Sequence, residues 1–72
     1  MDLDEFYKKI AIRIKVLRHE QGLTQERLSE LAGINLDYLG KIEVNKNKPG
    51  LVALYKIIKA LNITFGDFFR DI

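Results

Sequence analysis

Residues 24–43 decide the fold, and they read TQERLSELAGINLDYLGKIE. Thr24 is a favourable N-cap, because its hydroxyl can accept a hydrogen bond from a backbone N–H in the first turn of a helix. The residues that follow predict a short helix from Gln25 to Ala32, with Leu28 and Leu31 facing inward. The stretch therefore opens with a helix of about two turns.

A glycine and an asparagine separate this helix from the next one. Gly33 relaxes the backbone in the turn, and Asn35 can cap a third helix whose inward residues are Leu39 and Ile42. Two short helices can cross steeply only where the contact residue is small, and Ser29 meets that need. The pattern predicts a helix-turn-helix, whose second helix can enter the major groove of DNA. An ordinary helical corner is the alternative.

Helical periodicity continues on the N-terminal side. Between Leu3 and Gln21, apolar residues recur at spacings of 4, 4 and 3, as expected for one face of a helix. Ile12 and Val16 widen this stripe, which predicts that the helix is buried on more than one side. The stripe itself consists of Phe6, Ile10, Ile14 and Leu17.

The C-terminal side adds two more helices. Residues 51–61 carry Leu51, Leu54, Ile57, Ile58 and Leu61 at helical spacing. Thr64 resembles the cap of a last helix of about seven residues, in which Phe65 and Phe68 are assigned to the core. Since no alternating strand pattern occurs, the sequence predicts an all-α fold: a compact five-helix bundle, formed by a single domain over residues 1–72, with the helix-turn-helix at about 25–44.

The composition argues against catalysis and against metal binding. The chain has no cysteine and a single histidine, so a thiol nucleophile is absent and zinc ligands are scarce. His19 and Ser29 fall in different helices, and Glu26 and Glu30 fit a solvated helix face better than a pair of catalytic acids. We therefore expect no enzyme, no catalytic residue, no cofactor and no metal.

The charge is unevenly distributed along the chain. Residues 8–59 carry eleven lysines and arginines against five acidic side chains, a net +6, whereas residues 1–7 carry −3. A basic middle section suggests a polyanionic partner, and a solvated lysine-rich surface is the alternative. No apolar run has the length of a membrane span, and the acidic N-terminus is unlike a signal peptide. The expected location is cytoplasmic and nucleoid-associated, with no membrane contact.

Short segments along nearly the whole chain match a known pattern. They are Ile14-Lys15-Val16-Leu17-Arg18, Gly22-Leu23-Thr24-Gln25, Leu28-Ser29, Ala32-Gly33, Tyr38-Leu39, Ile42-Glu43 and Lys48-Pro49. With this set the chain resembles the Xre/Cro-type helix-turn-helix family, which includes phage repressors and restriction–modification controller proteins. The resemblance covers roughly residues 10–69. It implies a lambda-repressor-like DNA-binding domain without enzymatic activity.

The resemblance also implies the residues that meet DNA. Gln25 would contact a phosphate and brace the reading helix, and Tyr38 would contact a phosphate. Lys46 and Lys48 would clamp the DNA backbone, and Lys41 would read a base. The full set of implied DNA contacts is Gln25, Asn35, Leu36, Asp37, Tyr38, Lys41, Lys46 and Lys48.

Three of these positions keep two interpretations each. Leu36 either touches a thymine methyl group or packs beside the groove. Asp37 either accepts from cytosine N4 or favours the positive end of the helix dipole. Lys41 contacts either guanine or a phosphate. Two departures from the family accompany them: Gly40 lies inside the reading helix, and Asn45 replaces the usual glycine.

The resemblance further implies a buried ion pair between Arg18 and Glu43 and a homodimer. Candidate interface residues are Val52, Tyr55, Phe69 and Ile72, as an apolar patch for a two-fold partner. The predicted function is a sequence-specific regulator of transcription that binds double-stranded DNA at a palindromic operator and controls its own gene or a restriction–modification system. The alternative is an antitoxin that acts by protein–protein interaction, so RNA polymerase or a toxin is a further candidate partner.

Overall fold

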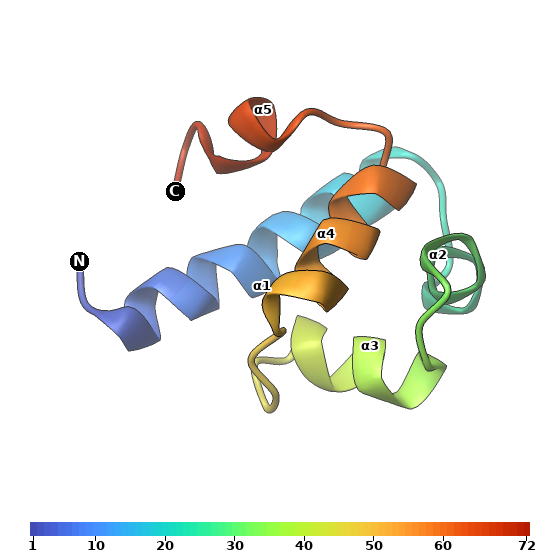
Figure 1. Cartoon of the computed structure of the whole chain (residues 1–72), viewed down its shortest axis with the longest axis horizontal. Helices are drawn as coiled ribbons and strands as arrows, with labels where there is room; N and C mark the ends of the chain where they lie inside the picture. The colour runs from blue at the N-terminus through green and yellow to red at the C-terminus, as the bar shows by residue number, and fades with distance from the viewer.

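The computed structural model describes residues 1–72 as five helices and no strand (Figure 1). The all-α, five-helix prediction is confirmed. The last helix has five residues instead of about seven, and the other predicted bounds hold to within one residue. The helices are α1 (Leu3–Glu20), α2 (Gln25–Ala32), α3 (Leu36–Glu43), α4 (Leu51–Ala60) and α5 (Phe65–Phe69).

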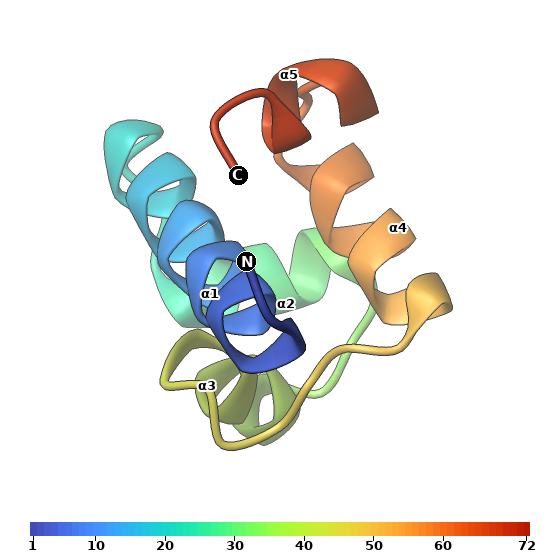
Figure 2. The ribbon, with the colours of Figure 1, turned by 90° about the vertical axis from the view of Figure 1, so that its left-hand side faces the viewer.

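The long helix α1 lies along one side of the molecule, α3 packs against it, and α2 packs against α3 and α4 (Figures 1 and 2). In both views α3 and α5 lie at opposite ends, with α4 between them. The short helix α5 is tied to α1 by Arg13, whose guanidinium donates to the carbonyl oxygens of Asp67 at 3.0 Å and Phe68 at 3.2 Å. Helix α3 packs against α1 and α2 at the opposite end of the molecule from α5.

A single hydrophobic core holds the five helices together, and every helix contributes to it. Burying one large aliphatic or aromatic side chain stabilises a fold by roughly 1.5–3 kcal/mol. Since a chain of this length buries only about 60% of its unfolded surface, the core must be densely filled. The largest fully buried side chains are Ile10, Ile14, Leu28, Leu39, Ile42, Ile57, Ile58, Leu61 and Phe68.

Local side-chain caps explain where the helices begin. The hydroxyl of Thr24 accepts from the backbone N–H of Arg27 at 3.0 Å, and the side chain of Asn35 accepts from that of Tyr38 at 3.1 Å. Thr64 caps α5 in the same way, as predicted. Helix α4 starts at Gly50 and has no side-chain cap.

Four apolar side chains predicted to face inward are exposed instead. On α1, Ile12 and Val16 are 52% and 42% exposed, so the prediction that this helix is buried on more than one side is wrong. Ile72 lies beside them but leaves both side chains partly exposed. Leu31 is 47% exposed because α2 presents only Leu28, Ser29 and Ala32 to the core.

Phe65 is the fourth of these exposed side chains, and its predicted place in the core is wrong. It lies at the first position of α5 and is 41% exposed. Its ring stacks on the ring of Tyr55, with 5.6 Å between the centroids. Phe68 is fully buried, as predicted. Phe65 begins α5 at the edge of the core, where it covers Tyr55 of α4 and stays partly in contact with water.

Candidate nucleic-acid interface

The helix-turn-helix is built from α2 and α3 with a turn of three residues between them. Gly33 has a φ of 68°, in the left-handed region that glycine adopts without strain. Its neighbour Ile34 donates its backbone N–H to the carbonyl of Ser29 at 3.0 Å, which closes the end of α2. Ser29 is buried, and its hydroxyl donates to the carbonyl of Glu26. The small contact residue and the relaxed turn therefore lie where the sequence placed them.

A buried ion pair fixes α3 against α1. The guanidinium of Arg18 donates to both carboxylate oxygens of Glu43, from Nε at 2.9 Å and from Nη2 at 3.0 Å. The side chain of Glu43 is 1% exposed and that of Arg18 is 9% exposed. Arg18 also donates to the carbonyl of Leu23 at 2.8 Å. The predicted ion pair is confirmed, and no buried side-chain polar atom lacks a partner.

Gln25 extends this network to α2. Its Nε2 donates to Oε1 of Glu43 at 3.2 Å, so one carboxylate connects three helices. The amide oxygen of Gln25 lies beside the backbone of Gly40 in the middle of α3. Gln25 therefore braces α3, as the family resemblance implied, and its oxygen stays near the outer surface.

The outward surface of α3 brings together five of the predicted DNA-contacting residues. Leu36, Asp37 and Lys41 are exposed, and the ammonium of Lys41 lies 3.0 Å from a carboxylate oxygen of Asp37. Gln25 and Lys46 line the same shallow hollow as these three side chains, together with Gly40 and Val44. We call this hollow the α3 notch.

The remaining three predicted DNA-contacting residues lie outside the α3 notch. The side chain of Asn35 is used as the cap of α3, and Tyr38 is half-buried against the core. Both residues line a separate hollow beside the start of α4. Lys48 points back toward α1, where its ammonium lies 3.8 Å from a carboxylate oxygen of Asp4 and 5.7 Å from the ring centroid of Tyr7.

The four predicted interface residues do not form one cluster. Val52 and Tyr55 on α4 are 68% and 52% exposed. Phe69 is half-buried and stacks on Phe6 of α1, and Ile72 lies beside Ile12 and Val16 on another side of α1.

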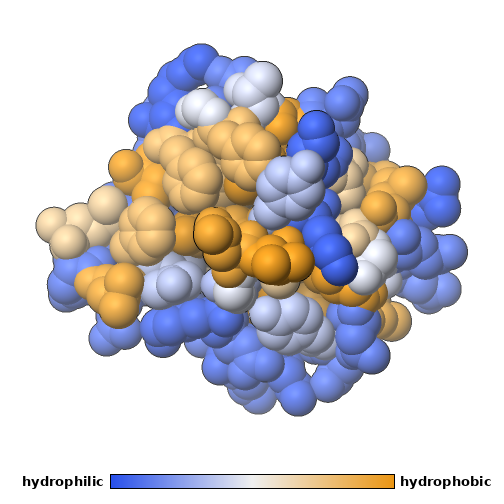
Figure 3. Space-filling view, in the orientation of Figure 1, coloured by the Kyte–Doolittle hydropathy of each residue, from blue (hydrophilic) through white to orange (hydrophobic).

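Leu51 and Phe65 join Val52 and Tyr55 as exposed apolar side chains of α4 and α5, and sequence reasoning did not single them out for this surface. Figure 3 shows apolar side chains gathered on this face, over α4, α5 and the N-terminal part of α1. We call Leu51, Val52, Tyr55 and Phe65 the α4–α5 surface. Helix α5 has only five residues, so the spacing of its apolar residues could not predict from the sequence which face is exposed.

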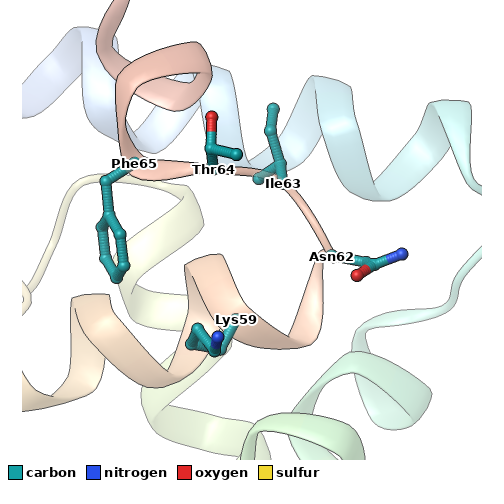
Figure 4. A pocket seen from close by; sticks show the side chains of 5 residues that line it. All are labelled: Lys59, Asn62, Ile63, Thr64 and Phe65. Atoms are coloured by element: carbon teal, nitrogen blue, oxygen red, sulfur yellow. The ribbon is translucent and has the colours of Figure 1, made fainter.

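The hollow between α4 and α5 offers no catalytic arrangement. Figure 4 shows its five side chains pointing in different directions, with Lys59 the only charged group among them. No group of three or more histidine, cysteine, aspartate or glutamate side chains is placed to hold a metal ion. No helix is long and apolar enough to cross a membrane.

The family model described as helix-turn-helix matches residues 14–68. The chain is 32% identical over 66 residues to the HTH-type transcriptional regulator SutR of Escherichia coli, which covers 92% of this chain and 37% of the regulator. It is 41% identical over 51 residues to the immunity repressor protein of Bacillus phage phi105, which covers 71% of this chain and 35% of the repressor. The chain thus spans about a third of these curated relatives.

Two solved structures are similar to the structure of this chain over nearly their full length. The restriction–modification controller protein C.AhdI from Aeromonas hydrophila superposes with a TM-score of 0.84 and 32% identity, covering 90% of this chain and 98% of the other. The wild-type controller protein C.Esp1396I superposes with a TM-score of 0.87 and 28% identity, covering 97% and 88%.

With α2 and α3 arranged as described, the chain belongs to the helix-turn-helix family. The resemblance predicted from the sequence is confirmed. Its relatives are regulators of transcription and controller proteins, not enzymes, in agreement with the prediction that the chain is not an enzyme.

Proposed function

We propose that the protein is a DNA-binding regulator of transcription that binds a palindromic operator as a homodimer. The observation that carries this proposal is the outward face of α3, where Leu36, Asp37 and Lys41 are exposed on a helix that a buried network holds rigidly. A short helix presented in this way fits the major groove. The structural likeness to C.AhdI, which extends over both chains, supports a controller-like role in which the protein acts on its own promoter.

The positions of the lysines around α3 suggest which of them contact bases and which contact phosphates. Lys41 lies on the outward face and reads a base, whereas Lys46 follows the helix and contacts phosphate. Lys48 is held by Asp4 and Tyr7 in the free protein and turns to phosphate on binding. Asn35 and Tyr38 contact the backbone beside the start of α4, and Gln25 contacts a phosphate at the start of α2.

The α4–α5 surface is the proposed dimer interface. Its four side chains are 41–84% exposed in the single chain, and a two-fold partner would remove them from water. Phe69 and Ile72 lie outside this surface and are half-buried in the single chain. In the dimer the two α3 helices enter successive major grooves, on half-sites about 34–36 Å apart.

The first experiment selects duplexes from a random library with the purified protein and then measures binding by fluorescence anisotropy at about 150 mM salt. We expect a two-fold symmetric selected sequence and a preference over a scrambled duplex of roughly a thousandfold. Equal, weak binding to both duplexes would refute the proposed regulator. Capture of a partner protein in place of DNA would then favour the antitoxin alternative.

The second experiment tests the interface by sedimentation. The double change Val52→Lys and Tyr55→Lys places charges on the α4–α5 surface, and we expect a monomer where the wild-type chain is a dimer. Ile12→Lys is the matched control, because Ile12 is equally exposed on another side of α1. If the double variant stays dimeric, or if the control also dissociates, the assigned interface is wrong.

A further inference from the structure

Gly40 occupies the middle of α3, although nothing inside the molecule requires a glycine there. Its φ is not in the left-handed region, where only Gly22 and Gly33 are found among the glycines. A Cβ added at Gly40 would meet one neighbour, the amide oxygen of Gln25 at 3.6 Å, which is an ordinary van der Waals contact. Since glycine is a poor helix former and an added Cβ would make only an ordinary contact, the fold itself gives no reason for a glycine at this position.

The missing side chain leaves a gap in an apolar ridge. Leu36, Gly40 and Val44 follow one another at intervals of four residues, so they lie on one stripe of the helix. Leu36 is 44% exposed and Val44 is 60% exposed. The ridge therefore presents an apolar side chain, a gap one side chain deep, and a second apolar side chain.

This gap is the floor of the α3 notch. The notch has a volume of about 360 Å³, far more than the roughly 30 Å³ of one water molecule, so it can receive the edge of a base. Lys41 and Lys46 line it and supply positive charge that attracts a nucleic acid, and Asp37, which is paired with Lys41, and the amide of Gln25 line it as well. A base that carries a small apolar group fits between Leu36 and Val44.

We propose that the α3 notch binds the 5-methyl group of a thymine in the operator, with Leu36 and Val44 on either side and Gly40 beneath. The thymine methyl is the one apolar group that base pairs present in the major groove. The inference rests on the proposed function, because it assigns a base contact to the same DNA-binding surface. It gives Gly40 a specificity-determining role, as a Cβ there would occupy the space of the methyl group.

The test replaces each thymine of the selected duplex, one at a time, by deoxyuridine, which lacks only the methyl group. For the wild-type chain we expect one position in each half-site at which the replacement weakens binding about fourfold, the value for burial of one methyl-sized group. The variant Gly40→Ala should bind the thymine duplex more weakly and should lose or reverse the preference for thymine at that position alone.

Gly66→Ala is the matched control, since Gly66 is also helical and an added Cβ there meets nothing within 4 Å. It should leave the thymine preference unchanged. Circular dichroism melting should show that Gly40→Ala is folded at least as stably as wild type. If no thymine responds to loss of its methyl, or if Gly40→Ala keeps the full preference, the inference is overturned. Failure of the wild-type chain to prefer its selected duplex would instead refute the proposed function.

Discussion

Helix α3 carries an ion pair on each of two faces, and the two pairs differ in almost everything except their chemistry. On the inner face, Glu43 is 1% exposed and receives hydrogen bonds from Arg18 and Gln25. On the outer face, Lys41 and Asp37 are 48% and 77% exposed and form an ion pair with each other. Burial decides the role of each charge. The inner pair sets the position of the helix, and the outer pair sets the charge that the helix shows to a ligand.

The largest expected effect comes from breaking the inner pair. Arg18→Ala leaves the carboxylate of Glu43 buried without its main partner, and we expect a loss of about 3–5 kcal/mol in the free energy of unfolding. Urea denaturation measures this loss. The double change Arg18→Met with Glu43→Leu removes both charges and should recover most of the stability. A single variant that stays within 1 kcal/mol of wild type would contradict the role given to this network.

The second effect concerns the outer face alone. Lys41→Ala should leave the stability of the fold nearly unchanged, because the pair with Asp37 is exposed. It should relax base preference at one operator position by about 1–3 kcal/mol, measured by binding to single-base variants of the selected duplex. Weakening of all duplexes by the same factor would make Lys41 a phosphate contact instead.

A third and smaller effect is expected from Asp37→Asn, which frees Lys41 from its partner. Affinity for a scrambled duplex should rise by up to about fivefold, since an exposed pair contributes at most about 1 kcal/mol. Stability should fall slightly, because Asp37 lies in the first turn of α3, where a negative charge is favourable. The affinity measured by anisotropy should therefore rise, while the free energy of unfolding measured with urea should fall. An unchanged affinity would show that the pair does not restrain Lys41.

The smallest effect is expected where α3 ends. Asn45 has a φ of 60°, and the backbone N–H of Lys46 donates to the carbonyl of Lys41 at 2.8 Å around it. Asn45→Gly should raise the free energy of unfolding by about 0.5 kcal/mol, because glycine enters this conformation more easily than asparagine. Asn45→Ala should lower it. Thermal melting distinguishes the two, and equal melting temperatures would show that the turn carries no strain.

The helices can be predicted from local sequence, and the candidate site from the family resemblance. Caps such as Thr24, Asn35 and Thr64 act on residues three positions away, and the spacing of buried residues repeats within a few turns, so both are readable without knowing the fold. The outward set on α3 is implied by the family resemblance of the sequence. The pair between Asp37 and Lys41 was also within reach, because residues four apart on a helix are neighbours.

Local sequence does not show which apolar side chains remain exposed or where the long cationic side chains point. Ile12, Leu31 and Phe65 are apolar, but their burial depends on whether another helix covers them. Lys48 turns to Asp4 and Tyr7, more than forty residues away in the chain. Helical periodicity reports contacts within one element, whereas exposure depends on how separate elements pack, and that packing is set by the whole core at once.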